Sequence, residues 1–406
     1  MPSRQVAALL ATASLFSAST AIETVDGSSC GCFLSNGTNA GYYTNHAFFD
    51  FRQLLQHAGV PDVIDNKANV ASAPSSSNFF TSDAWTSFWE VETWDNSKGA
   101  AASDRNKNTL SNDATVYMIN SPSNIYIEKA ANSSYGSGDD NAATFLTMRT
   151  KRLRDFQTAA EFQTSGAGYQ FLSLRMRART VGAPGAVTAM FTYRGDDDPA
   201  KVQEADIEIL TRDPRSVIQY TNQPSDLPGQ GEIAEATRNV TLPGSVAWSD
   251  WAVHRLDWTP ERSVWYVDGR EAASIAFQVP RDPAAVNFNA WSDGGSWSGN
   301  MTVGDEASLQ IQWIEMLYNT TGAGKRSVAG AGQEPRIGGG SRAARTGGSH
   351  DTCKVVCTID DAADVGKVAL LSNSTGDSAA HSLQAAVGPG QLAFGWAVAA
   401  ILYTIL

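Results

Sequence analysis

The chain has 406 residues, of which 42% are hydrophobic and 18% are charged, and its formal net charge is −12 at pH 7. This charge argues against a nucleic acid or an anionic lipid surface as the partner, because both require clusters of Lys and Arg. It is compatible with a neutral substrate, although ordinary solubility accounts for an acidic exterior equally well.

Residues 1–21 have the layout of a cleaved secretory leader. One basic residue, Arg4, precedes the apolar run 6–16, and small residues follow as far as Ala21. We therefore expect a secreted protein that begins near residue 22. Six Asn-x-Ser/Thr sequons agree with this route and could carry glycans: Asn36, Asn132, Asn239, Asn300, Asn319 and Asn373.

Four cysteines occur in two close pairs, Cys30 with Cys32 and Cys353 with Cys357. An oxidising compartment would allow two disulfides, but the pairing cannot be read from the sequence. These spacings, with no His nearby, are not those of a zinc site, and the acidic run 196–198 is more typical of a solvated loop than of a calcium site. We predict no metal and no cofactor.

Residues from about 28 to 321 have the composition of one all-β domain, rich in aromatic and β-branched residues. An antiparallel sandwich or barrel can hold roughly 250 residues in a single domain. Large apolar side chains almost disappear after residue 322, which predicts a flexible connection. The expected division is a leader at 1–21, the β domain at 22–321, the connection at 322–350, a Cys-containing tail at 351–380 and a removed anchor signal at 381–406.

The end of the chain predicts a lipid anchor. The uncharged apolar run 390–406 follows a polar spacer and the small residues 378–380. This layout is typical of an anchor signal, and a membrane-spanning helix or an incidental apolar terminus are the alternatives. We expect a GPI-anchored protein of the plasma membrane and cell wall, attached to the membrane only through that anchor.

The elements of the β domain can be predicted from hydrophobic periodicity. The segment 48–58 is the best candidate for a short helix. The turn at 259–262 would join its two flanking strands into a hairpin. Strands are expected at 169–180, 186–193, 201–210, 252–258, 263–270 and 308–318.

The strand predicted at 201–210 carries acids at alternate positions. Because side chains alternate along a strand, Glu204, Asp206 and Glu208 share one face, and the apolar residues between them share the other. We expect the apolar face to pack inward and the acids to face a groove. Like charges and desolvation would then raise the pKa of at least one acid and leave it protonated beside an ionised neighbour, as acid-plus-nucleophile chemistry requires.

The spacing also sets a condition on this chemistry. Four residues of extended strand separate the Cα atoms of Glu204 and Glu208 by about 13 Å, whereas a retaining glycosidase needs carboxyl groups roughly 5–5.5 Å apart. The strand must therefore bend toward the groove, and both outer side chains must be long. A solvated acidic strand on an outer surface is the alternative.

The run 204–208, Glu-Ala-Asp-Ile-Glu, resembles the Glu-x-Asp-x-Glu signature of glycoside hydrolase family 16, in the form without an extra bulge residue. The segments 169–193, 252–270 and 287–300 are similar to the strand pair, the hairpin and the Asn-x-Trp groove segment of that family, in the same order. The front part and the tail look most like fungal wall-associated members.

This resemblance implies a two-sheet antiparallel β-jelly-roll of the concanavalin type, with a concave sugar-binding cleft. It implies a retaining hydrolase or transglycosidase in which Glu204 is the nucleophile, Glu208 the general acid/base and Asp206 the residue that orients the nucleophile. The implied substrate is cell-wall β-glucan, with β-1,3 or mixed β-1,3/1,4 linkages and chitin as a candidate acceptor. We expect a monomer.

Other residues would support sugar binding. Trp291 and Trp297 would form aromatic walls, with core packing as the alternative. Asn289 and Asn222 would hold hydroxyl groups, unless they serve turns. His254 would hydrogen-bond near the acidic strand or have a structural role.

Two further questions stay open at this stage. The roles of three Trp residues, Trp85, Trp89 and Trp94, are undecided, whereas Trp258, Trp265 and Tyr266 are expected in the core. A non-catalytic glycan-binding protein on the same fold is the alternative function, since a fold does not fix an activity.

Overall fold

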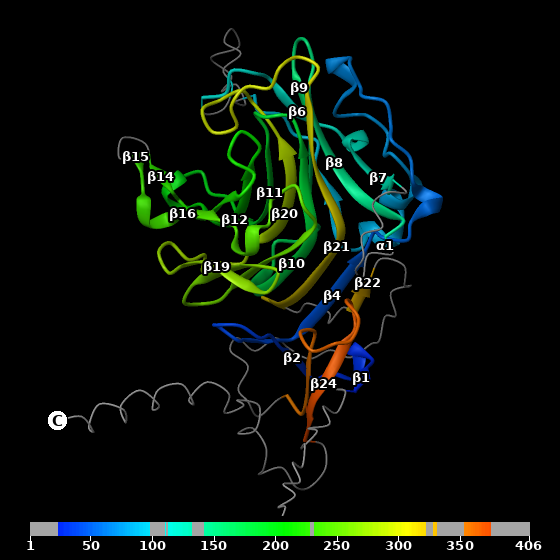
Figure 1. Cartoon of the computed structure of the whole chain (residues 1–406), viewed down its shortest axis with the longest axis vertical. Helices are drawn as coiled ribbons and strands as arrows, with labels where there is room; N and C mark the ends of the chain where they lie inside the picture. Colours follow the sequence, from blue (N-terminus) through cyan, green and yellow to red (C-terminus); the bar gives the residue numbers. More distant parts are fainter. Residues whose placement is uncertain are drawn as a thin grey trace, which may run out of the picture.

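The computed structural model is built almost entirely of antiparallel β-strands (Figure 1). It describes residues 23–97, 110, 113–131, 142–227, 231–321, 328–330 and 353–374. The predicted leader at 1–21, most of the predicted connection at 322–350 and the predicted anchor signal at 381–406 lie outside these ranges. Within the ranges, no helix combines the length and the apolar character needed to cross a membrane.

Seven strands form the front sheet, which carries the acidic strand β12 (Gln203–Leu210). All its neighbouring strands run antiparallel. In spatial order the sheet contains β5 (Trp89–Val91), β9 (Gln157–Thr164), β20 (Ala285–Trp291), β11 (Val187–Arg194), β12, β13 (Val217–Gln223) and β16 (Thr237–Thr241).

The back sheet is built around the long strand β21 (Glu306–Thr320). On one side lie β10 (Tyr169–Gly182), β17 (Ala252–Trp258), β18 (Ser263–Val267) and β19 (Arg270–Ile275). On the other lie β4 (Asn45–Asp50), the short parallel β22 (Val328–Gly330), β8 (Thr144–Arg152) and β7 (Ile125–Lys129). Pairing of β8 with β9, and of β6 (Met118–Asn120) with β9, joins the two sheets.

The two sheets pack against each other around one large apolar core. The apolar residues of β12 enter this core opposite those of β10, because both strands alternate with a period of two. Trp258, Trp265 and Tyr266 are buried as expected, and so are Trp85 and Trp89. The expected all-β, two-sheet antiparallel sandwich is confirmed.

The predicted strands are present, but the helix expected at 48–58 is wrong. Residues up to Asp50 belong to β4, which pairs with β21, and a single 3-10 turn, η2 (Leu55–His57), follows. The remaining helical turns are short: α1 (Asp83–Thr86), η1 (Gly27–Ser29), η3 (Lys67–Asn69), η4 (Asn78–Thr81), η5 (Pro122–Asn124), η7 (Pro199–Lys201), η8 (Ala234–Ala236) and η9 (Pro243–Ser245). The strands β14 (Asp226–Leu227) and β15 (Gly231–Glu232) pair as a two-stranded antiparallel ribbon.

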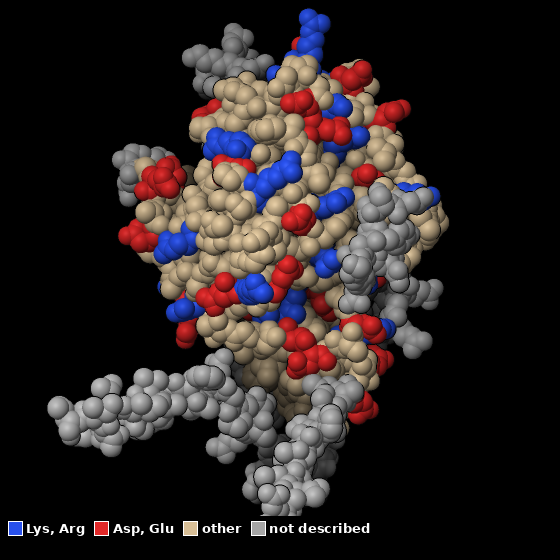
Figure 2. All heavy atoms as spheres, viewed as in Figure 1, with Lys and Arg blue, Asp and Glu red and all other residues tan. Residues whose placement is uncertain are grey.

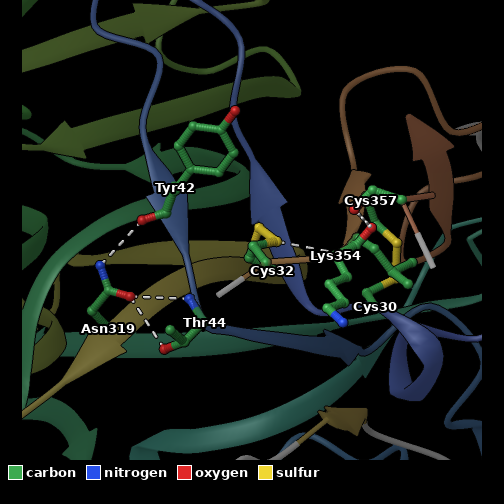
Figure 3. Close-up of a disulfide and its surroundings, with 10 residues drawn as sticks. Cys30, Cys32, Tyr42, Thr44, Asn319, Lys354 and Cys357 are labelled. Carbon is green, nitrogen blue, oxygen red and sulfur yellow. Dashed lines mark hydrogen bonds between the residues drawn. A yellow bond between two sulfur atoms is a disulfide. The ribbon is translucent and has the colours of Figure 1, made fainter. Parts of the chain in front are cut away.

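A third sheet, here the accessory sheet, brings together the two ends of the described chain, below the sandwich in Figure 1. Its order is β1 (Thr24–Val25), β24 (Val368–Asn373), β23 (Val355–Thr358), β2 (Cys32–Leu34) and β3 (Tyr42–Tyr43). The disulfides Cys30–Cys357 and Cys32–Cys353 cross this sheet (Figure 3). Residues 353–374 therefore fold together with the front of the chain.

The accessory sheet packs on the outer face of the back sheet. Phe33, Tyr43 and Val368 form a small apolar cluster with Leu317 of β21. Asp360 forms an ion pair with Arg175 of β10 at 2.7 Å and lies 3.6 Å from Arg255 of β17. The accessory sheet thus lies on the opposite side of the sandwich from the acids of β12.

A further contact ties the accessory sheet to β21. In Figure 3, Asn319 accepts a hydrogen bond from the Thr44 N–H and donates one to the Tyr42 carbonyl. The link between β3 and β4 is fixed by these bonds. The side chain of one predicted glycan acceptor is therefore engaged within the fold.

Charged side chains of both signs are interspersed over the face seen in Figure 2, with much uncharged surface between them. This face shows no concentration of Lys and Arg.

Candidate active site

The three acids of β12 lie on the face of the front sheet that points away from the core, which we call the acidic face. Ala205, between two of them, points into the core. Asp206 is only 1% exposed, and Glu204 and Glu208 are partly exposed. The alternation read from the sequence therefore places all three carboxyls together on one surface.

The carboxyls of Glu204 and Glu208 both have raised pKa values. Burial is the main cause for Glu204, and the negative charges of Glu208 and Glu161 add to it, while a hydrogen bond with Asp206 opposes the shift; the pKa is about 8. Burial raises the pKa of Glu208 to about 7, against a lowering hydrogen bond from Trp297. Both groups therefore exchange protons near neutral pH.

Asp206 lies between these two residues. Its burial raises its pKa well above the ordinary range, and the charges of Glu204 and Glu208 raise it further. A hydrogen bond from Gln223 acts in the opposite direction. Because the three groups interact strongly, they titrate as one system, in which a protonated Asp206 can donate to an ionised Glu204.

The neighbouring strands add polar side chains to the acidic face. The register places Tyr193 opposite Glu204 and Thr221 opposite Asp206. Asn289 also lies on this face, yet it is only 9% exposed. Asn289 is therefore covered by neighbouring side chains although it points away from the core, and we call this covered part of the acidic face the recess.

Several polar atoms in this recess have no hydrogen-bond partner. They are Oδ1 of Asp206, Nδ2 of Asn287 and Oδ1 of Asn289. Unpaired buried polar atoms cost stability, and native proteins keep them chiefly where a function requires them. Atoms of this kind also occur in the core, at Tyr220 and His254 for example, so it is their combination with the three carboxyls that marks this part of the acidic face as the candidate active site.

Glu161 of β9 is a fourth acid on this face, and the sequence reasoning missed it. It lies opposite Asn289, and burial raises its pKa to about 7. The indole N–H of Trp94 donates to Glu161 at 3.3 Å, while the Trp94 ring stays 45% exposed. The available signal was the alternation in 159–163, where Glu161 falls between two inward-facing residues.

Both predicted aromatic residues lie near the acids. The indole N–H of Trp297 donates to Oε1 of Glu208 at 3.2 Å, and the ring is 39% exposed. Trp291 ends β20, two residues beyond Asn289 and on the same face of the sheet. Asn289, Trp291 and Trp297 are therefore brought together with the carboxyls.

Asn222 and His254 are not brought to the acidic face. Asn222 lies opposite Ala205, so its side chain points toward the core, where it is fully buried and donates to the Phe277 carbonyl. His254 points into the core from β17, and its ring nitrogens have no hydrogen-bond partner. Burial lowers its pKa to about 4. The structure thus corrects both expected sugar contacts to core positions.

The described residues contain no group of three or more His, Cys, Asp or Glu side chains that could hold a metal ion. In the acidic run 196–198, Asp198 instead caps the turn η7 by accepting from the Ala200 N–H. Its pKa is lowered by this bond and by Lys201.

Residues 120–315 match the sequence model of the family described as Glycosyl hydrolases family 16. A β-glucanase of Bacillus licheniformis is 27% identical over 174 residues, which cover 42% of this chain and 66% of the relative. A xylanase/β-glucanase of Ruminococcus flavefaciens is 29% identical over 182 residues, 44% of this chain and 21% of the relative. The Probable glycosidase CRR1 of Saccharomyces cerevisiae is 25% identical over 194 residues, 45% of this chain and 42% of the relative.

The chain thus covers less than two thirds of the length of each of these relatives. Among solved structures, the B. licheniformis β-glucanase overlays 58% of this chain and 94% of its own with a TM-score of 0.40 and 19% identity. An endo-β-1,3-glucanase from Pyrococcus furiosus overlays 58% and 89% with a TM-score of 0.41 and 19% identity. Residues 120–315 are thus similar to family 16 glycosyl hydrolases, and the matched relatives include β-glucanases.

Proposed function

We propose that this chain is a glycosidase that cleaves internal bonds of a β-glucan with retention of configuration. The observation that carries the proposal is the set of three carboxyls at alternate positions of β12, recessed on one sheet face and with raised pKa values. The family match and the β-glucanase relatives support the same activity. A pure binding surface gains nothing from crowding like charges at this cost.

In the proposed reaction, ionised Glu204 attacks the anomeric carbon while protonated Glu208 gives its proton to the departing glycosidic oxygen. The three carboxyls titrate as one system, so the pKa values of Glu204 and Glu208 belong to the coupled group, and the reaction uses the form in which the charge lies on Glu204. This step forms a bond from the sugar to Glu204 and releases the leaving chain as an alcohol. Glu208, now ionised, takes a proton from water or a sugar hydroxyl, whose oxygen displaces Glu204. Asp206, protonated, would hold Glu204 in place by its hydrogen bond.

The aromatic rings on the acidic face suit a glucan chain. Trp94, Trp291 and Trp297 come from three different segments around the carboxyls, and a pyranose presents C–H faces that stack on such rings. Asn289 and Glu161 lie opposite each other on the same face and add hydrogen-bonding groups. This distribution supports binding of several sugar units beside the carboxyls.

The cellular setting is also a proposal. We infer a secreted, GPI-anchored enzyme that trims or transfers β-glucan in the cell wall, with chitin as a candidate acceptor. The sequence of the leader and tail supports anchoring. The accessory sheet adds a geometric argument: β24 ends on the side opposite the acidic face, so a tether leaving there would keep the carboxyls accessible to the polymer.

The assignment of roles can be tested by chemical rescue. We expect Glu204→Ala and Glu208→Ala to lose turnover of an activated aryl β-glucan oligosaccharide, and azide to restore it. Azide attack on the substrate itself would give an α-glycosyl azide with Glu204→Ala, whereas attack on a glycosyl-enzyme would give the β-anomer with Glu208→Ala. The reverse assignment of anomers would exchange the two roles.

The glycan-binding alternative is decided by the same proteins. Wild type is compared with Glu204→Gln for turnover and for oligosaccharide binding on β-1,3- and mixed-linkage glucans. Equal binding without turnover in either protein would replace the enzyme proposal by a lectin-like function. Product sizes from wild type would separate hydrolysis, which shortens chains, from transfer, which also lengthens them.

A further inference from the structure

The loop that carries Trp297 is held by a segment outside the family match, which begins at residue 120. The N–H groups of Thr115 and Val116 donate to the Asp293 carbonyl at 3.0 and 2.8 Å. The Thr115 hydroxyl donates to the Gly294 carbonyl at 2.8 Å. The segment 113–116 and the loop therefore form one hydrogen-bonded unit.

Ser296, the residue before Trp297, is hydrogen-bonded through both its N–H and its carbonyl. The Ser296 N–H donates to the Asp113 carboxylate at 2.7 Å, and the Ser296 carbonyl accepts from the Arg212 guanidinium. Arg212 belongs to the turn that follows β12, the strand of Glu208. The two peptide groups that flank Ser296 are thus both hydrogen-bonded, one through its N–H and the other through its carbonyl, so the backbone before Trp297 has little freedom to rotate and the direction of the Trp297 side chain is restricted.

Two glycines allow the segment to approach this closely. A Cβ atom on Gly295 would lie 2.6 Å from Oδ1 of Asp113, and one on Gly294 would lie 2.4 Å from the Thr115 hydroxyl. Gly294 also has φ +69°, which favours glycine. The contact between the two segments is thus closely fitted rather than incidental.

The restricted indole in turn acts on the acid/base candidate. Its N–H bond to Glu208 stabilises the ionised carboxylate and opposes the rise in pKa that burial causes. A loosened Trp297 would therefore leave Glu208 with a higher pKa. The charged and titratable groups of the surrounding elements are Glu161, Glu204, Asp206, Arg212, Asp213 and Asp293.

We propose that Asp113 is a positioning residue of the active site, which together with Arg212 fixes the backbone on both sides of Ser296 so that the Trp297 indole meets Glu208. Its kinetic consequences rest on the proposed function, whereas the restraint on the loop does not. Asp113 does not touch the reacting atoms; it acts through Ser296 and Trp297.

The restraint is tested first without any activity. Hydrogen exchange of the peptide 291–299, followed by mass spectrometry, should become faster in Asp113→Ala. Asp113→Asn keeps an oxygen that accepts from Ser296 and should exchange nearly as slowly as wild type. Asp364→Ala, which removes an exposed carboxylate on the accessory sheet, is the matched control. Unchanged exchange in Asp113→Ala overturns the proposal.

The kinetic test uses a double-mutant cycle with Trp297→Phe, which keeps a ring but removes the N–H. Asp113→Ala should lower kcat/KM about 3- to 10-fold, the size expected for one lost hydrogen bond, mainly through kcat. Because the pKa of Glu208 would rise, the alkaline limb of the pH profile of kcat/KM should also move to higher pH. In the Trp297→Phe background the same change should have little further effect.

Each outcome of the cycle decides the proposal. A full additional loss in the Trp297→Phe background would mean that Asp113 acts by another route, and an unshifted pH profile would remove its link to Glu208. Recovery in Asp113→Asn distinguishes positioning from a general loss of folding. If wild type turns over no glycan, the proposed function fails, and the exchange experiment still decides whether Asp113 restrains the loop.

Discussion

Charged side chains are arranged in opposite ways in two regions of the molecule. One region is the acidic face of the front sheet, and the other is the contact beneath the accessory sheet. On the acidic face, burial raises the pKa values of Glu204 and Glu208, and the charge of Glu208 raises the pKa of Glu204 further. Beneath the accessory sheet, Asp360 is buried beside Arg175 and Arg255, and these cations lower its pKa. Opposite charges are thus paired where the accessory sheet attaches to the sandwich, whereas like charges are grouped at the candidate active site.

Glu204→Gln breaks the crowded side of this comparison and has the largest expected effect. Removing the proposed nucleophile should lower kcat by at least about 10³-fold. The same variant should be more stable than wild type at neutral and alkaline pH, because the folded state raises the pKa of Glu204 from 4.5 to about 8. The wild type therefore loses stability as pH rises from about 4.5 to 8, and the variant escapes that loss.

The measurement for Glu204→Gln is the Tm of both proteins between pH 4 and pH 9, beside initial rates on a soluble β-glucan. The difference in Tm should be small at pH 4 and should grow in favour of the variant up to pH 8. A variant that is less stable than wild type at pH 8.5 would contradict the account of the acidic face as a destabilised site.

Removing both disulfides tests the other region of the comparison, the accessory sheet. Cys30–Cys357 and Cys32–Cys353 close loops of nearly the same length, with sequence separations of 327 and 321 residues, so each one largely substitutes for the other. Loss of both should cost about 3–5 kcal/mol of unfolding free energy, and loss of one much less. Denaturant unfolding of the two double variants and the quadruple Cys→Ala variant measures this. Equal losses from one pair and from both would contradict it.

Asp360→Ala tests the ion pairs themselves. It leaves Arg175 buried without its partner and should lower the unfolding free energy by about 3 kcal/mol. Because Arg175 lowers the pKa of Asp360, the stabilisation is present above the unfolded pKa of 3.8 and is lost as pH falls through the folded value. Asp364→Ala serves as control, since Asp364 is exposed on the same sheet. A loss that persists unchanged down to pH 2 would exclude the ion pair as its cause.

The two regions also differ in how far the sequence could predict them. The acidic strand was visible because alternation is a local property that survives packing, and β10, β11 and the hairpin of β17 and β18 were found in the same way. His254 shares its side of β17 with Leu256 and Trp258, so the same rule already indicated a core position. Asn222 required the register between β12 and β13, which no local pattern contains.

The accessory sheet could not be predicted from the sequence, because strands that pair in it are distant along the chain. β2 pairs with β23, and the disulfides join residues more than 320 positions apart. The helix expected at 48–58 failed for a related reason: pairing of β4 with β21 decides the structure of its first residues, whatever their local preference. Asp113 and Ser296 likewise meet only through the fold.

Glu161→Gln has the smallest expected effect, and it tests how one carboxylate on the acidic face changes the pKa of another. The charge of Glu161 is one cause of the raised pKa of Glu204, so its removal should lower that pKa and move the pH profile of kcat/KM to lower pH. The amide oxygen can still accept from the Trp94 indole, which keeps the sugar-facing geometry in place. Glu306→Gln, on the back sheet, removes the same charge far from the acids and should leave the profile unchanged. An identical shift in both variants would mean that net charge, rather than the crowding of carboxyls on the acidic face, sets the protonation of Glu204.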